Sequence, residues 1–181
     1  KGLDWRRSGK ELLPLEWHES LSQANNKQTP ATPSAADEKH NITILDCRNS
    51  YESDVGLFQS AIPLNTTSFR ESWKALDEIL ANTPKDQPIY TYCTGGIRCV
   101  KINAYLEQKL GFNNTYRLQG GIIAYRRELE RLKQQQEQQQ QLAKENIDLR
   151  SQFRGVNFVF DERIGERITD EVLSFCESCG S

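Results

Sequence analysis

Three short runs of β-branched and aromatic residues alternate with segments of helical periodicity, and this alternation restricts the possible fold more than any other feature. The runs cover residues 42–47, 89–93 and 115–118. Residues 71–80 and 98–110 lie between them and carry apolar side chains three and four positions apart. Short apolar runs of this kind suit strands that are buried on both faces of a parallel sheet. The pattern therefore predicts an α/β fold, an open parallel sheet with helices on both faces.

The chain is long enough for one ordinary domain with extensions, because 181 residues can bury a single sizeable core. We expect five segments, which are an N-terminal helical lead-in (1–21), a flexible loop (22–41), the α/β core (42–130), a glutamine-rich helix or linker (131–152) and a C-terminal segment (153–181). The sequence has no Met, even at position 1, so we expect it to be a piece of a longer protein.

The extensions have distinct local signals. Residues 11–21 have helical spacing, and Pro14 is placed as a first-turn residue would be. Residues 22–41 are polar and lack periodicity, which predicts a flexible surface loop. Seven glutamines occur within residues 134–141, where a helix that frays is favoured over a disordered tether. Residues 155–161 form a separate strand-like segment.

Charge and cysteine content limit the class of protein. A net charge of −2 does not indicate a large nucleic-acid footprint. No stretch approaches the roughly 20 apolar residues of a membrane helix, so no membrane partner is expected. Five cysteines without a secretory leader favour a reducing, intracellular setting, either cytoplasmic or organellar. Two basic clusters are interpreted as solvated helix faces: Arg6, Arg7 and Lys10, and Arg126, Arg127, Arg131 and Lys133.

The candidate nucleophile is Cys93, which stands where the second run ends and a helix begins near Arg98. A glycine-containing turn between strand and helix directs backbone N–H groups inward, and the helix N-terminus adds partial positive charge. We therefore predict a lowered pKa for the Cys93 thiol and nucleophilic sulfur chemistry. The residues expected to bind substrate around it are Thr94, Gly95, Gly96, Ile97 and Arg98. The alternative is a buried cysteine that acts as a small hydrophobic residue.

The stretch from Cys93 to Arg98 resembles the active-site loop of the rhodanese superfamily. Other parts of residues 42–125 agree with it: Asp46-x-Arg48 followed by Glu52, then Gly56-Leu57-Phe58, Ala61-Ile62-Pro63 and the Gly120-Gly121 turn. The resemblance implies a rhodanese-like core and a cysteine that carries sulfur as a persulfide. It also implies a small sulfur donor such as thiosulfate as a partner.

A narrower resemblance is to the rhodanese-like tRNA uridine hydroxylases and the thiosulfate sulfurtransferase/rhodanese-like domain-containing family. It rests on residues 93–99 with Lys101, and on three flanking strings at residues 16–18, 67–70 and 157–163. It implies oxygen-dependent hydroxylation at carbon 5 of the wobble uridine, an essential loop cysteine, and tRNA as a partner of the full-length protein. Family members also carry an N-terminal domain and further C-terminal cysteines that this sequence lacks, whereas they lack its glutamine tract.

Several residues have supporting roles. Asp46 and Arg48 either orient the loop from behind or pair structurally with a neighbour such as Glu52. Cys99 has two possible roles: it forms a disulfide with Cys93 once Cys93 is a persulfide or is oxidised, or it faces the core. Lys101 follows on the same helix. The two histidines, His18 on a surface-type helix and His40 in the loop, are not expected to act as bases, which argues against a Cys-His protease.

Cys176 and Cys179 have the spacing of half a tetrahedral zinc site. A structural zinc normally needs four protein ligands, and no Cys or His follows Cys179. We expect no cofactor within this chain, with zinc only in a full-length protein.

Three other functions stay open. A dual-specificity phosphatase loop has five residues between Cys and Arg, whereas four separate Cys93 from Arg98, which favours sulfur over a phosphoryl group. A generic thiosulfate sulfurtransferase that does not act on tRNA would have the same loop. A non-catalytic rhodanese-like module would bind a partner, although the intact Cys93, glycines and Arg98 argue against it.

Overall fold

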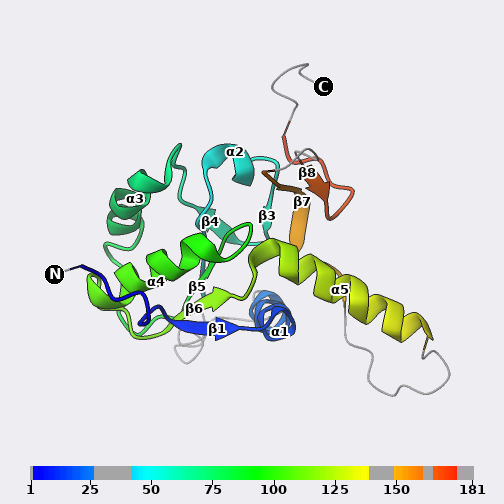
Figure 1. Ribbon diagram of the computed structural model, residues 1–181, viewed down its shortest axis with the longest axis horizontal. Coiled ribbons are helices and arrows are strands. Elements are labelled where there is room, and N and C mark those ends of the chain that lie inside the picture. Colours follow the sequence, from blue (N-terminus) through cyan, green and yellow to red (C-terminus); the bar gives the residue numbers. More distant parts are fainter. Residues whose placement is uncertain (1, 27–41, 139–148, 161–164, 175–181) are drawn as a thin grey trace, which may run out of the picture.

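A five-stranded, fully parallel sheet forms the centre of the computed structural model, which describes residues 2–26, 42–138, 149–160 and 165–174 (Figure 1). The strand order is β1-β6-β5-β2-β4. The strands are β1 (Lys10–Leu12), β2 (Thr43–Asp46), β4 (Ala61–Pro63), β5 (Ile89–Tyr92) and β6 (Thr115–Leu118). The predicted parallel sheet is confirmed, and three of its strands match the three apolar runs.

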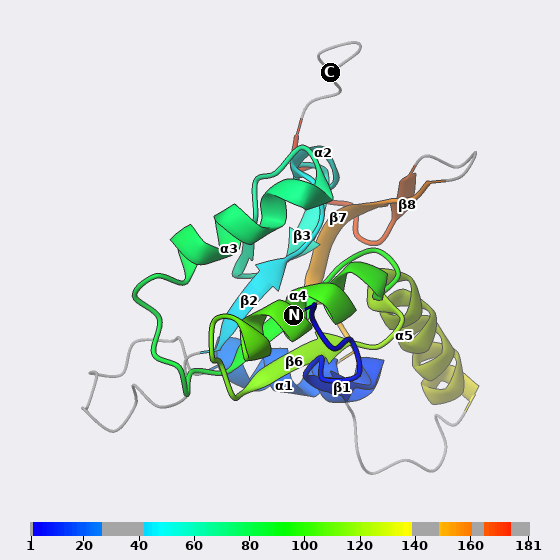
Figure 2. The same ribbon diagram turned by 60° about the vertical axis from the view of Figure 1, so that its left-hand side comes forward.

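Helices cover both faces of this sheet, as predicted (Figure 2). One face packs against α1 (Pro14–Asn26) and α5 (Gly121–Gln138), and the other against α3 (Ser72–Ile79) and α4 (Ile97–Gln108). The described residues also form two short helices, α2 (Ser50–Ser53) and η2 (Phe69–Glu71). Each face of the sheet therefore has its own hydrophobic core.

The central strand β5 is buried along its whole length, and its alternation decides which face each side chain meets. Tyr90 and Tyr92 point toward Trp17 of α1, with ring centroids 5.4 and 6.2 Å away. Ile89 and Cys93 belong to the opposite core, beside α4. The period of two residues therefore directs Cys93 toward α4.

A second, antiparallel sheet joins the C-terminal segment to the core. Its order is β3-β7-β8, formed by β3 (Gly56–Phe58), β7 (Phe153–Phe158) and β8 (Gly165–Arg167). Phe153 is fully buried, with its ring 5.3 Å from that of Phe58. The strand expected at 155–161 is thus present at slightly different bounds and packs against the α/β core.

The N-terminal region differs from the sequence-based expectation. Residues 10–12 form an edge strand paired with β6 rather than the start of a helix, because Pro14 begins α1 and Leu12 is buried against the sheet. The helix continues to Asn26, so residues 22–26 are not part of a loop. The rest of the expected loop, 27–41, lies outside the described residues.

The expected helix before and within the glutamine tract is present as α5, which extends away from the sheets to Gln138 (Figure 1). Residues 139–148 lie outside the described part of the chain. Arg126 on this helix pairs with Glu130 at 2.9 Å and with Glu166, and Arg131 pairs with Glu128 at 2.6 Å. Among the described residues, no helix has the length and apolar character that a membrane span requires.

Candidate active site

Cys93 directly follows β5 at the carboxyl end of the sheet, where sites form in open α/β folds. The N–H of Gly96 donates to Cys93 Sγ at 3.1 Å. Gly96 caps α4 with a φ of +85°, a conformation that glycine adopts without strain. The predicted arrangement of a backbone amide directed at the sulfur is therefore present.

The N-terminus of α5 holds the Cys93 loop in place from the other side. The N–H groups of Ile122 and Ile123 donate to the carbonyl oxygens of Cys93 and Thr94 at 3.1 and 3.2 Å. This approach needs a glycine at position 121, since a Cβ there would lie 2.3 Å from the Cys93 oxygen. The Gly-Gly turn noted in the sequence thus fixes the loop backbone.

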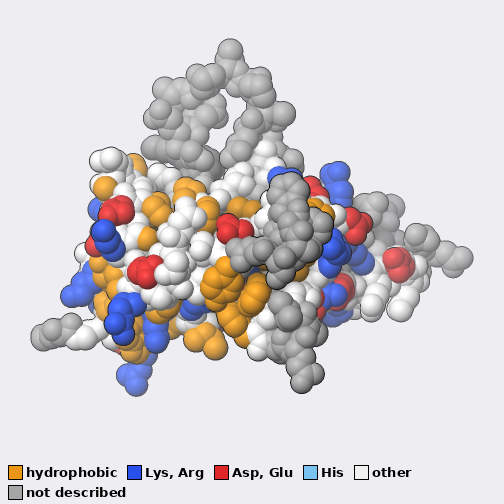
Figure 3. Space-filling view, turned by 90° about the horizontal axis from the view of Figure 1, so that it is seen from above, with side chains coloured by type: hydrophobic (Ala, Val, Ile, Leu, Met, Phe, Trp, Pro, Cys, Tyr) orange, Lys and Arg blue, Asp and Glu red, His pale blue; other side chains and the backbone are white. Residues whose placement is uncertain are grey.

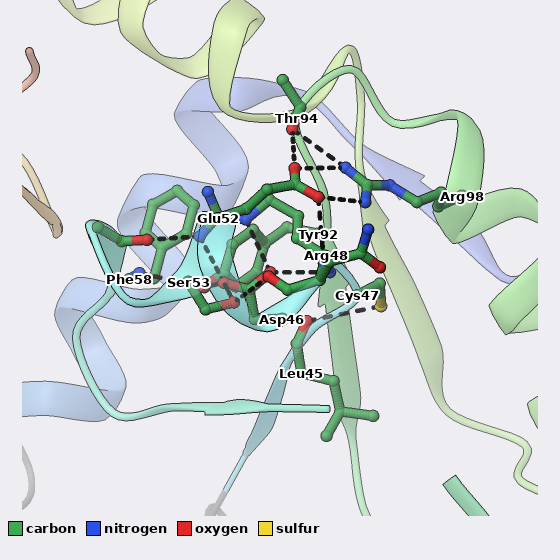
Figure 4. A network of polar contacts seen from close by, with 12 residues as sticks. Leu45, Asp46, Cys47, Arg48, Glu52, Ser53, Phe58, Tyr92, Thr94 and Arg98 are labelled. Carbon is green, nitrogen blue, oxygen red and sulfur yellow. Dashed lines mark hydrogen bonds and ion pairs between the residues drawn. The ribbon is translucent and has the colours of Figure 1, made fainter. Parts of the chain in front are cut away.

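Arg98 is fixed by a buried carboxylate, Glu52 of α2 (Figure 4). Its Nη1 and Nη2 lie 2.7 and 2.8 Å from Glu52 Oε2 and Oε1, and Thr94 Oγ1 donates to Oε1 at 2.9 Å. Burial alone would raise the pKa of Glu52, but the hydrogen bonds and charge of Arg98 hold it below its ordinary value. Arg98 is the expected fixed cation, and its charge is compensated by an ionised Glu52.

Asp46 and Arg48 form a separate pair behind the loop, with side chains fully buried (Figure 4). Arg48 Nε and Nη2 lie 2.8 and 2.5 Å from the two Asp46 oxygens, and Tyr92 donates its hydroxyl to Asp46 at 2.7 Å. The alternative of structural pairing is confirmed, but Asp46 and Arg48 pair with each other and not with Glu52, which pairs with Arg98. The Asp46–Arg48 pair braces the ends of β2 and β5.

The prediction of a lowered pKa for Cys93 is wrong for its thiol in the folded protein. A hydrogen bond with the Cys99 side chain, followed by burial, raises the pKa of Cys93 well above its ordinary value. The charge of Arg98 and its backbone N–H act in the opposite direction but are weaker. Cys93 is only 1% exposed, so the resting sulfur is a protonated thiol at neutral pH.

Cys99 faces the core, which is one of its two expected descriptions, and its role as a resolving partner of Cys93 stays a prediction. It is fully buried in the core on α4, and its thiol interacts electrostatically with those of Cys93 and Cys47. All three cysteines are free thiols. We refer to Cys47, Cys93 and Cys99 as the three-thiol cluster.

The remaining predicted loop residues differ in exposure. Thr94 is buried, whereas Gly95 is exposed and the side chain of Ile97 is 79% exposed. Lys101 is exposed on α4, with Nζ 5.9 Å from the ring centre of Phe69.

The structure describes one of the two histidines and neither of the predicted metal ligands. Cys176, Cys179 and His40 lie outside the described residues, and within the described ones no group of three or more His, Cys, Asp or Glu could hold a metal. His18 is buried rather than on the surface, with Nδ1 2.9 Å from the Tyr125 hydroxyl. It packs on the α1 and α5 face of the sheet, opposite Cys93.

Glu52 is the site residue whose role the sequence reasoning missed. Its backbone position is set by a capping box, in which Asn49 N–H donates to Glu52 Oε2 at 3.1 Å. The Asn49-x-x-Glu52 spacing is visible in the sequence and marks the start of α2. The long-range partner Arg98 has no comparable local signal.

The site is a Cys-x4-Arg loop at the carboxyl edge of a parallel α/β sheet. Residues 29–128, more than half of this chain, match the rhodanese-like domain family. The chain belongs to that family.

Curated relatives are similar over a longer stretch. A tRNA uridine(34) hydroxylase of Photorhabdus laumondii subsp. laumondii is 44% identical over 136 residues, which are 75% of this chain and 34% of that protein. One of Sodalis glossinidius, with the same name, is 42% identical over 137 residues, 76% of this chain and 34% of its own length. The chain therefore spans about a third of these relatives.

Among solved structures, a rhodanese-related protein from Thermoplasma volcanium matches with a TM-score of 0.46 and 20% identity. The match covers 66% of this chain and 92% of that protein.

Proposed function

We propose that this chain is the catalytic rhodanese-like domain of a tRNA wobble-uridine hydroxylase and that Cys93 is its nucleophile. The observation that carries the proposal is the hydrogen bond from Gly96 N–H to Cys93 Sγ at the carboxyl end of the central strand. The names of the curated relatives support tRNA uridine as the substrate. Family membership supports the sulfur chemistry.

The elementary reaction that this site supports is persulfide formation on Cys93. After the Cys93 thiol gives its proton to solvent hydroxide, Cys93 Sγ attacks the outer sulfur of thiosulfate, and a new S–S bond forms. The S–S bond of thiosulfate breaks, and sulfite leaves with the electron pair. The Gly96 N–H and the Arg98 guanidinium lie where negative charge on the persulfide needs stabilisation.

The high resting pKa of Cys93 gives this reaction a pH dependence. Only the thiolate attacks, so the rate rises with pH through the neutral range. Arg98 stays protonated at every relevant pH, and an anionic donor would share its guanidinium with Glu52.

The first test measures persulfide directly. The purified chain is incubated with thiosulfate, and intact mass is expected to increase by one sulfur atom. Cys93→Ser should give no increase, whereas Cys47→Ala, which removes a thiol of the same cluster, should retain it. A persulfide yield that Cys93→Ser leaves unchanged would contradict the proposal.

The second test addresses tRNA. Deletion of the gene in the source organism should abolish wobble nucleosides derived from 5-hydroxyuridine, and expression of the gene should restore them unless it carries Cys93→Ser. Unchanged nucleosides together with persulfide formation would indicate a generic thiosulfate sulfurtransferase instead.

A further inference from the structure

Three aromatic rings form a continuous row that begins beside Arg98. The guanidinium carbon of Arg98 lies 6.0 Å from the ring centre of Phe160. The Phe160 ring packs edge to face on Phe158 at 5.3 Å, and Phe158 packs likewise on Tyr51 at 5.2 Å. Tyr51 directly precedes Glu52, the partner of Arg98. We call Tyr51, Phe158 and Phe160 the aromatic row.

The outer members of this row are open to solvent. Phe160 is 65% exposed and Tyr51 is 38% exposed, whereas Phe58 and Phe153 in the same part of the fold are fully buried. Figure 3 views the molecule from the side of α2, and hydrophobic side chains gather on that face. Packing in the core therefore does not account for the position of Phe160.

A cationic group, Arg98, lies at the end of the row nearest the candidate site. Arg98 holds one position next to Phe160, and its contacts with Glu52 and Thr94 fix its orientation. Lys101 is exposed on α4 three residues after Arg98, and its Nζ lies 5.9 Å from the ring centre of Phe69. A solvent-open aromatic ring next to a fixed guanidinium is a combination that binds single-stranded nucleic acids.

We propose that Phe160, supported by Phe158 and Tyr51, stacks on a nucleobase of single-stranded RNA bound next to the Cys93 loop. This inference rests on the proposed function, because a tRNA substrate must present unpaired bases to the site. Stacking recognises the flat face of any base. Lys101, exposed on the same helix as Arg98, is available to contact a phosphate.

The test measures binding of the full 181-residue chain to a fluorescent oligouridylate of about eight nucleotides by anisotropy. Phe160→Ala is expected to weaken binding about tenfold, in line with the loss of one stacked base, and Phe160→Trp should restore it. Leu13→Ala is the matched control, because Leu13 is a 53% exposed apolar residue just before α1 and should not change affinity. Phe160 is exposed, so none of these variants threatens folding.

Three results would overturn the inference. The first is equal affinity of Phe160→Ala and the unchanged protein for oligouridylate, and the second is no binding of oligouridylate at all. The third is an equal loss of affinity of Phe160→Ala for an oligomer whose bases are removed, because the effect would then come from phosphates.

Persulfide formation separates this inference from the proposed function. Persulfide formation by the unchanged protein is measured alongside its binding of oligouridylate, with Leu13→Ala as the control variant in both assays. A persulfide without base-dependent RNA binding overturns the stacking site alone. Base-dependent binding without any persulfide supports the stacking site and removes the sulfur chemistry.

Discussion

Glu52 and Arg98 form an ion pair with two hydrogen bonds, 2.7 and 2.8 Å long, between helices that are 46 residues apart in the chain. Glu52 is fully buried, and the Arg98 side chain is 19% exposed. The pair links α2 to the start of α4 and so joins the two segments that follow β2 and β5. The Glu52–Arg98 pair therefore stabilises the conformation of the Cys93 loop as well as placing charges beside it.

Arg98→Met should destabilise the fold by about 3 kcal/mol near neutral pH, since it leaves a buried carboxylate without its cation. The loss should shrink as the pH falls, because the pKa of Glu52 rises without Arg98 and the carboxyl is then protonated. Urea unfolding at about pH 7 and about pH 5 measures this, and Arg98→Met combined with Glu52→Gln should recover part of the stability at about pH 7. A loss of unfolding free energy that is the same at both pH values would contradict the assignment of Arg98 as the cation that pairs with ionised Glu52.

Cys99→Ala should lower the pKa of Cys93, since the hydrogen bond with Cys99 is the largest cause of its elevation. The pH profile of persulfide formation from thiosulfate should therefore move to lower pH, with about tenfold more thiolate for each pKa unit. Cys47→Ala serves as the control, because Cys47 contacts Cys99 rather than Cys93. An unmoved profile in Cys99→Ala would show that Cys99 does not set the reactivity.

The stability of the fold should decrease at alkaline pH. The pKa values of Cys93 and Cys99 are raised in the folded state, so the unfolded chain releases these protons first, above about pH 8.5. Their stabilising contribution is complete below that pH and is lost as the pH rises toward the folded-state values. The slope is at most about 1.4 kcal/mol per pH unit for each thiol.

Urea unfolding between about pH 8 and about pH 10 under reducing conditions measures this fall. The Cys93→Ala/Cys99→Ala variant should show a shallower decrease. Tyr125, whose pKa burial raises to about 12, contributes in both proteins only at the upper end of this range. Equal slopes would indicate that the thiols are not responsible.

Gly121→Ala should disrupt the Cys93 loop. A Cβ at this position would meet the Cys93 carbonyl oxygen at 2.3 Å, and the φ of +63° adds backbone strain. We expect a loss of about 1–3 kcal/mol in unfolding free energy and a reduced persulfide yield. Gly95→Ala is the matched control for stability, since nothing lies within 4 Å of its added Cβ. Equal stability of the two variants would contradict the close approach of α5.

The sequence determined the features that depend on neighbouring residues. Alternation of apolar runs and helical periods specified the parallel sheet, because each period reflects a local backbone geometry. Pro14 marked the start of α1, and Gly96 allowed the tight turn that aims an amide at Cys93. These properties need no knowledge of distant parts of the chain.

Only the tertiary structure decided the features that depend on residues far apart in sequence. The pairing of Lys10–Leu12 with β6 and of β7 with β3 needs partners about 100 residues away, so a weak local pattern became a strand. The choice of Arg98 as the partner of Glu52 followed from how the loops meet at the sheet edge. The pKa shift of Cys93 is opposite to the predicted one, because folding buries the thiol beside Cys99. Desolvation and contacts with distant side chains are properties of the packed molecule.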